Sequence, residues 1–233
     1  MTRAYLMRAC SALALAVFSI VVKIDNVYAL DPDWILRKDQ HGIRVYSQSV
    51  AGSQIDKVRG VTILKTSLNR LVTLLRDPEQ RQSWDKLCGE AYIYERITDT
   101  EELVYLHVTL PWPVSDRDML VRTRWAQDDD TLKVEMFSEA ERNVLPPVNG
   151  LVRVKRANHF WELTPLGNGK VQVITVAHLD PEGALPAWLL NKLAVDSPFE
   201  ALENIRLMIE DNNFIHRHYD FIKEPTPVEN GLL

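Results

Sequence analysis

The order of apolar and polar residues predicts a sheet of short strands followed by one long helix. Between residues 91 and 179, six blocks alternate apolar and polar side chains with a period of two, as half-buried strands do. Two earlier blocks, residues 42–50 and 56–64, show the same alternation. Residues 185–212 instead carry apolar side chains at helical spacing, and Pro198 should kink the helix that they predict.

Helices are also predicted ahead of the strands and between them. Residues 32–39 predict a short helix, and residues 66–85 predict a helical run that Ser67 can cap and that Pro78 divides in two. The pattern as a whole predicts an α+β fold in which a curved antiparallel sheet wraps around the long C-terminal helix. A single helix in the concave face of such a sheet leaves room for a cavity, which is a natural place for a ligand.

The first 29 residues have the features of an export signal. Arg3 and Arg8 precede an apolar run at positions 9–22, which is shorter than the roughly 20 residues that span a bilayer. Small residues then precede a cleavage point after Ala29. We therefore predict an exported protein, periplasmic or secreted, whose signal is removed; an uncleaved membrane anchor is the alternative.

Composition indicates a folded, acidic domain. The 233 residues are 46% hydrophobic and 25% charged, with a formal charge of −5. The first 29 residues contribute +2, so the remainder carries −7. Because phosphate binding needs a basic footprint, this charge argues against a nucleic-acid partner. Cys88 is the one cysteine after the signal, so no disulfide within the chain is expected.

Familiar catalytic and cofactor motifs are absent from the sequence. It holds no phosphate-binding glycine loop, zinc-protease motif or nucleophile elbow, so we expect no cofactor, no metal and no catalytic residue. His159, between apolar neighbours on a predicted strand, has three interpretations: a satisfied interior histidine, a ligand-binding histidine or a general base. His216 and His218 fit a solvated tail better than a metal site, and nothing pairs Cys88 with a base.

Four segments, taken in order, resemble the START domain family of StAR-related lipid-transfer proteins. They are Trp84-Asp85 and residues 110–119 (LPWPVSDRDM), 149–155 (NGLVRVK) and 179–191 (LDPEGALPAWLLN). The resemblance covers about residues 33–212 and is nearest to phosphatidylcholine-transfer-like members. It implies a helix-grip fold, a buried lipid site and no catalysis.

Two features depart from the family pattern. Thr123 stands where several members carry a buried arginine, and Ala157 and Ala177 stand where choline-binding members use aromatic residues. A neutral or weakly polar ligand, such as a sterol, fatty acid or diacylglycerol, therefore fits at least as well as a phospholipid. For Arg117 and Asp118, at a strand entry, we expect a structural role in ion pairing and in hydrogen bonds that cap the turn.

Strand alternation assigns the side chains that face the interior, and these form the candidate lipid site. Small residues mixed with large ones in this set favour a cavity; plain core packing is the alternative. The candidate lipid-binding residues are Val104, Leu106, Val108, Met119, Val121, Thr123, Trp125, Val134, Met136, Ala157, His159, Trp161, Thr175, Ala177, Leu189 and Leu193.

A ligand held in such a cavity needs a gate. We hypothesise a lid made of residues 143–150 and 185–190, in which Leu145, Val148 and Trp188 touch lipid when the lid is open. A rigid proline-rich loop packed on the helix is the alternative.

The sequence thus predicts a signal peptide over residues 1–29, a START-like lipid-binding domain over residues 30–213 and a flexible tail over residues 214–233. The predicted function is non-enzymatic binding and transfer of a lipid or other hydrophobic small molecule, with transient membrane contact. Two alternatives remain: a helix-grip enzyme, either a cyclase or a hydrolase, that uses His159, and an interaction module whose interior is filled by side chains.

Overall fold

The protein is described by a computed structural model. The described residues are 33–53, 55–183, 185–186, 189–190, 192–211 and 217–226. The predicted signal peptide, residues 1–29, lies outside them.

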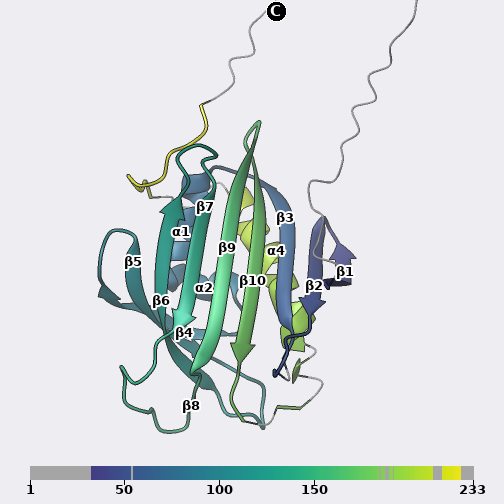
Figure 1. Ribbon diagram of the computed structural model, residues 1–233, viewed down its shortest axis with the longest axis vertical. Helices are drawn as coiled ribbons and strands as arrows, with labels where there is room; N and C mark the ends of the chain where they lie inside the picture. Colours follow the sequence, from purple (N-terminus) through teal and green to yellow (C-terminus); the bar gives the residue numbers. More distant parts are fainter. Residues whose placement is uncertain are drawn as a thin grey trace, which may run out of the picture. The chain divides into compact units, whose positions relative to one another are not determined.

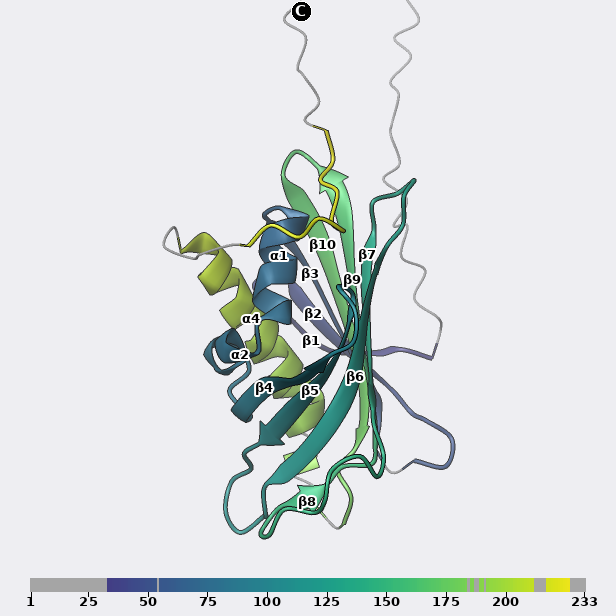
Figure 2. The ribbon, with the colours of Figure 1, turned by 90° about the vertical axis from the view of Figure 1, so that its left-hand side faces the viewer.

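The strands of the described chain form one ten-stranded sheet, and the helices lie on one side of it (Figures 1 and 2). The strand order is β1-β2-β3-β10-β9-β7-β6-β5-β4 with antiparallel neighbours, and β8 pairs in parallel with β6. The predicted α+β fold, a curved antiparallel sheet around a C-terminal helix, is confirmed. The strands are β1 (Ile35–Gln40), β2 (Ile43–Gln48), β3 (Lys57–Lys65), β4 (Cys88–Arg96), β5 (Glu101–Val108), β6 (Arg117–Gln127), β7 (Val134–Ala140), β8 (Val152–Arg153), β9 (Arg156–Gly167) and β10 (Lys170–Asp180).

The first strand corrects one prediction. Residues 32–39, expected as a helix, include most of the edge strand β1, which pairs with β2. The reason lies in the two-residue turn that follows, where His41 and Gly42 both have positive φ, at 53° and 73°. Turns of this kind match the twist of an antiparallel hairpin, so pairing with β2 overrides the helical pattern.

The two predicted helices between β3 and β4 are confirmed. α1 (Leu68–Arg76) begins at Ser67, whose hydroxyl accepts a hydrogen bond from the Arg70 amide at 3.3 Å. α2 (Pro78–Trp84) starts directly after it, because Pro78 cannot continue α1 but is well suited to a first helical turn. Together they carry the chain from β3 to β4 at the far edge of the sheet.

The C-terminal helix lies in the concave face, as predicted, and is not uniform. It contains a π-helical segment, η1 (Lys192–Asp196), followed directly by α4 (Ser197–Glu210), with Pro198 in the first turn of α4. Gly60 on β3 lets α4 approach the sheet, since a Cβ built there would lie 2.7 Å from a methyl carbon of Leu202. Among the described helices, none is long and apolar enough to cross a membrane.

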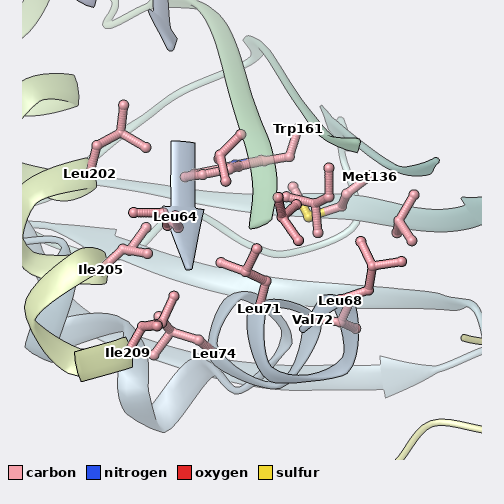
Figure 3. Packing of buried hydrophobic residues seen from close by; sticks show 14 of the residues in the cluster. Leu64, Leu68, Leu71, Val72, Leu74, Met136, Trp161, Leu202, Ile205 and Ile209 are labelled. Atoms are coloured by element: carbon pink, nitrogen blue, oxygen red, sulfur yellow. The ribbon is translucent and has the colours of Figure 1, made fainter. Parts of the chain in front are cut away.

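One end of the space between sheet and helices is filled by a packed cluster (Figure 3). Leu68, Leu71 and Leu74 of α1 meet Leu202 and Ile205 of α4, and all five are fully buried. Strand residues, among them Met136 and Trp161, close the cluster from the sheet side. This packed end holds the helices to the sheet and so positions whatever lies further along the same face.

Residues 217–226 differ from the flexible tail that was expected. Ile222 is 3% exposed within the packed cluster, and the Glu224 carboxylate accepts hydrogen bonds from the Leu68 and Asn69 amides at 3.1 and 2.6 Å. The carboxylate thus binds amides at the start of α1, and the start of a helix favours negative charge. The segment, which we call the C-terminal strap, is therefore part of the domain.

Candidate ligand-binding pocket

A pocket of about 290 Å³ lies between the sheet and the helices, beyond the packed end. Strands β5, β6, β7, β9 and β10 supply one wall, and α2, η1 and the first turns of α4 supply the opposite one. Most of the lining side chains are apolar. The volume is close to the lower limit of the range of about 300–1,000 Å³ that is common for small-molecule sites.

All but two of the predicted lipid-binding residues line this pocket. Their contact with a ligand stays a prediction, but the structure brings them together as the alternation indicated. The lining members are Val104, Leu106, Val108, Met119, Val121, Thr123, Trp125, Met136, Ala157, His159, Trp161, Thr175, Ala177 and Leu193.

The two exceptions are Val134 and Leu189. Val134 faces the same side of the sheet as Met136 but is fully buried in the packed cluster, so it forms core rather than pocket wall. Leu189 is also fully buried and does not reach the pocket, whereas its neighbour Leu190 does.

The predicted lid is placed differently from the expectation. Leu145 packs against Leu103, Tyr105 and Leu120, which point away from the pocket on the other face of the sheet. Val148 is 44% exposed. Trp188 lies outside the described residues. The loop that carries Leu145 and Val148 therefore follows the outer side of the sheet rather than covering the pocket wall.

Arg117 and Asp118 do not pair with each other, because adjacent strand residues point to opposite faces. Arg117 reaches inward and donates hydrogen bonds to the carbonyls of Pro181 and Glu182, both at 3.1 Å. Asp118 points outward, fully buried, and receives two hydrogen bonds of 2.7 Å from Arg153. The expected structural role holds, but each residue performs it with a different partner.

Sequence reasoning missed an ion pair at the junction of the packed end and the pocket. Arg76 of α1 lies 3.3 Å from Glu102 of β5, and both side chains are at most 3% exposed. Tyr219 and Phe221 of the C-terminal strap flank the guanidinium, at 5.0 and 5.4 Å from their ring centres. Alternation from Val104 places Glu102 on the inner face, so its position was predictable; its partner, on a distant helix, had no local signal.

Polar side chains form a row across the pocket wall, which we call the polar belt. Its members are Thr123 on β6, Ser138 on β7, His159 on β9 and Thr175 on β10. The Thr123 and Ser138 hydroxyls are 2.8 Å apart, and His159 Nε2 is 2.8 Å from the Thr175 hydroxyl. Ser138 was not among the predicted residues, although its period-two spacing from Met136 indicates the same face.

His159 is an uncharged member of the polar belt. Burial lowers the pKa of His159 to about 3, and the positive charge of Arg81 on α2 adds to the effect. The residue keeps part of its surface accessible and lines the pocket. A neutral imidazole offers one donor and one acceptor, and this ring serves hydrogen bonding rather than charge.

A sheet wrapped around a C-terminal helix, with a pocket between them, defines a helix-grip protein with an internal pocket. The START domain profile matches residues 18–207, which is more than half of the chain, and the chain belongs to this family.

Relatives and a solved structure support the same assignment. An uncharacterized protein of Pseudomonas aeruginosa is 30% identical over 200 residues, covering 86% of this chain and 96% of that protein. Phosphatidylcholine transfer protein of Mus musculus is 26% identical over 164 residues, covering 68% and 75% of the two chains. The crystal structure of a STAR-related lipid transfer protein fragment from Xanthomonas axonopodis has a TM-score of 0.70 and 33% identity, covering 77% of this chain and 99% of that one.

Proposed function

We propose that this protein binds a hydrophobic small molecule in the pocket between sheet and C-terminal helix and carries it between membranes. The observation that carries the proposal is the pocket itself, about 290 Å³ in volume and lined mainly by apolar side chains. The names of two similar proteins, a phosphatidylcholine transfer protein and a STAR-related lipid transfer protein, support lipid transfer as the class of activity.

The energetics of an acyl chain explain why such a carrier needs an enclosed apolar pocket. A buried methylene is worth about 0.8 kcal/mol, so a chain of about 16 carbons gains about 12 kcal/mol on leaving water. A pocket that replaces the bilayer at similar free energy lets the ligand leave one membrane and enter another. Affinity far above that of the membrane would trap the ligand.

The geometry favours binding over catalysis. Among the described residues, no carboxylate forms a hydrogen bond with His159, and a ring with a pKa of about 3 is a weak base at neutral pH. Burial also raises the pKa of the Cys88 thiol, which disfavours the thiolate that a nucleophile needs. We therefore assign no catalytic residue, and a turnover assay on ester or polyketide substrates would reveal an enzyme.

Membrane contact is proposed at the loop between β5 and β6. Trp112 in this loop is 90% exposed, and tryptophan is favoured at membrane interfaces. The loop adjoins the pocket, because Arg117 lines the pocket and binds the Pro181 carbonyl beyond β10. With a charge of −7 after residue 29, attraction to anionic lipid should be weak, so contact would be brief and apolar.

Export completes the proposed function. The apolar run at positions 9–22 and the small residues before position 30 support a cleaved signal and a periplasmic or secreted protein. N-terminal sequencing of the protein from its own compartment should begin at Leu30. An intact Met1 on a membrane-bound protein would contradict the cleavage.

The test of carriage is native mass spectrometry followed by transfer between liposomes. We expect the full chain, purified from the cells that export it, to carry an intact hydrophobic molecule. Ala157→Phe should plug the pocket and abolish transfer. The matched control is Ala126→Phe, which places the same ring on an exposed position of β6. Equal transfer by both folded variants would refute carriage in this pocket.

A further inference from the structure

The strand register aligns three members of the polar belt, Thr123, Ser138 and His159, at one level of an otherwise apolar wall. Thr123 pairs with Ser138, and Ser138 pairs with His159, across three neighbouring strands. Two residues along β6, β7 and β9, the next level consists of Trp125, Met136 and Trp161, and Thr175 on β10 stands opposite Trp161. A polar group on a bound ligand would therefore find its partners at the belt level, with apolar wall beside it.

The belt has more hydrogen-bond donors than its internal contacts use. If His159 Nε2 donates to Thr175, the threonine O–H has no acceptor among the described residues. If Thr175 donates instead, the N–H at Nδ1 of the ring has no acceptor there. In either arrangement one proton donor remains without a partner among the described residues. The Thr123–Ser138 pair likewise leaves one O–H unused.

The charged residues of the lining are already paired with groups of the protein. Arg76 binds Glu102, Arg81 binds Asp85 at 3.2 Å, and Asp56 lies 3.8 Å from Arg37. Arg117 is held by the carbonyls of Pro181 and Glu182. An ionised group buried at the belt would find no unpaired counter-charge among the described lining residues, and burying an unpaired charge is expensive.

We propose that the polar belt selects ligands whose polar group is an uncharged oxygen, a hydroxyl or a carbonyl, which accepts a hydrogen bond from the His159–Thr175 pair. This inference rests on the proposed function and names the ligand class that the pocket takes. The belt fixes how deep the polar group sits, and the apolar wall on either side takes the hydrocarbon.

The test uses four fluorescent probes on the full exported chain. Parinaric acid, its methyl ester and parinaryl alcohol share one conjugated chain and differ in the polar group, while diphenylhexatriene has no polar group. We expect His159→Phe and Thr175→Val to weaken binding of the alcohol and the ester roughly tenfold, the loss expected for one buried hydrogen bond. Diphenylhexatriene should bind each variant as it binds the original protein.

Controls separate the possible failures. Thr175→Ser keeps the hydroxyl and should restore alcohol binding, and unchanged diphenylhexatriene binding shows that a variant retains a folded pocket. The inference would be overturned if a variant lost binding of the alcohol and of diphenylhexatriene equally. It would also be overturned if the ionised parinaric acid bound most tightly at neutral pH. Either result would leave carriage intact. If none of the four probes binds the original protein, the proposed function itself fails.

Discussion

The two ends of the space between sheet and helices differ in how completely their side chains are buried. At the packed end, Leu68, Leu71 and Leu74 are fully buried against α4. At the hollow end, around the pocket, inward-facing residues such as Val104 and Ala157 stay partly exposed although they belong to the interior. The same sheet face therefore supplies a solid core at one end and a binding wall at the other.

Side-chain size and the position of α1 explain the difference. α1 lays leucines across the packed end, whereas the small residues Ala157 and Ala177 line the pocket. Trp125 and Trp161 belong to the packed cluster and also line the pocket. They form the end wall between the two regions and do not plug the hollow.

The largest effect is expected when the same deletion is made at both ends. Leu71→Ala at the packed end should lower the free energy of unfolding by about 3–5 kcal/mol, because it opens a cavity among fully buried neighbours. Leu106→Ala at the hollow end should cost about 2 kcal/mol, since the site already borders open space. Urea unfolding of both variants measures the difference, and equal losses would mean that the two ends are packed alike.

Enlarging a side chain should also cost more at the packed end than at the hollow end, with smaller effects than the deletions. Val72→Phe adds a ring to the packed cluster and should cost about 1–3 kcal/mol through overpacking. Ala177→Leu adds atoms next to the pocket and should change stability by less than about 0.5 kcal/mol. Thermal or urea unfolding checks both, and a large penalty for Ala177→Leu would show that the pocket cannot accept added volume.

These contrasts show which parts of the site the sequence could reveal. Inward-facing residues of the strands were predictable because side chains alternate with an exact period of two, so one anchor such as Val121 fixes the facing of a whole strand. Loops have no such rule. Leu145 lies on the outer face because its loop returns along β6, and nothing local in the sequence marks that path.

Long-range partners were the second limit. Arg76 is 26 residues from Glu102 and meets it only because α1 crosses the sheet, so their pairing depends on tertiary structure. The strand β1 was missed for a related reason, since the turn at His41 and Gly42 decides its pairing with β2. Ile222 in the C-terminal strap has apolar neighbours only in Phe221 and Tyr219 within a short, mostly polar segment, too weak a pattern to predict burial.

His159 allows the hollow end to be probed by pH. Its pKa falls from an ordinary 6.5 to about 3 in the folded protein, so between these values the unfolded state binds more protons. Stability should therefore fall as the pH drops through this window. His159→Phe removes this contribution. The slope of its unfolding free energy against pH should therefore correspond to up to one proton fewer taken up on unfolding than in the original protein.

Urea unfolding between pH 7 and pH 4 measures the effect. Carboxylates titrate in both proteins, so the difference between the two profiles isolates the histidine. The matched control is His218→Phe in the C-terminal strap, where the side chain is 73% exposed. Parallel profiles for all three proteins would show that His159 is not buried in the neutral form.

The smallest effect on stability is expected at Trp112, and it separates the two ends by function. Trp112→Ala removes a 90% exposed side chain near the hollow end, so unfolding should change by less than about 0.5 kcal/mol. Transfer of parinaryl alcohol between vesicles should nevertheless slow, because an interfacial anchor is lost.

Leu166→Ala is the control: Leu166 is 43% exposed in the β9–β10 hairpin, beyond the packed end. If both variants slow transfer equally, membrane contact is not confined to the hollow end; if neither does, the loop between β5 and β6 is not the contact.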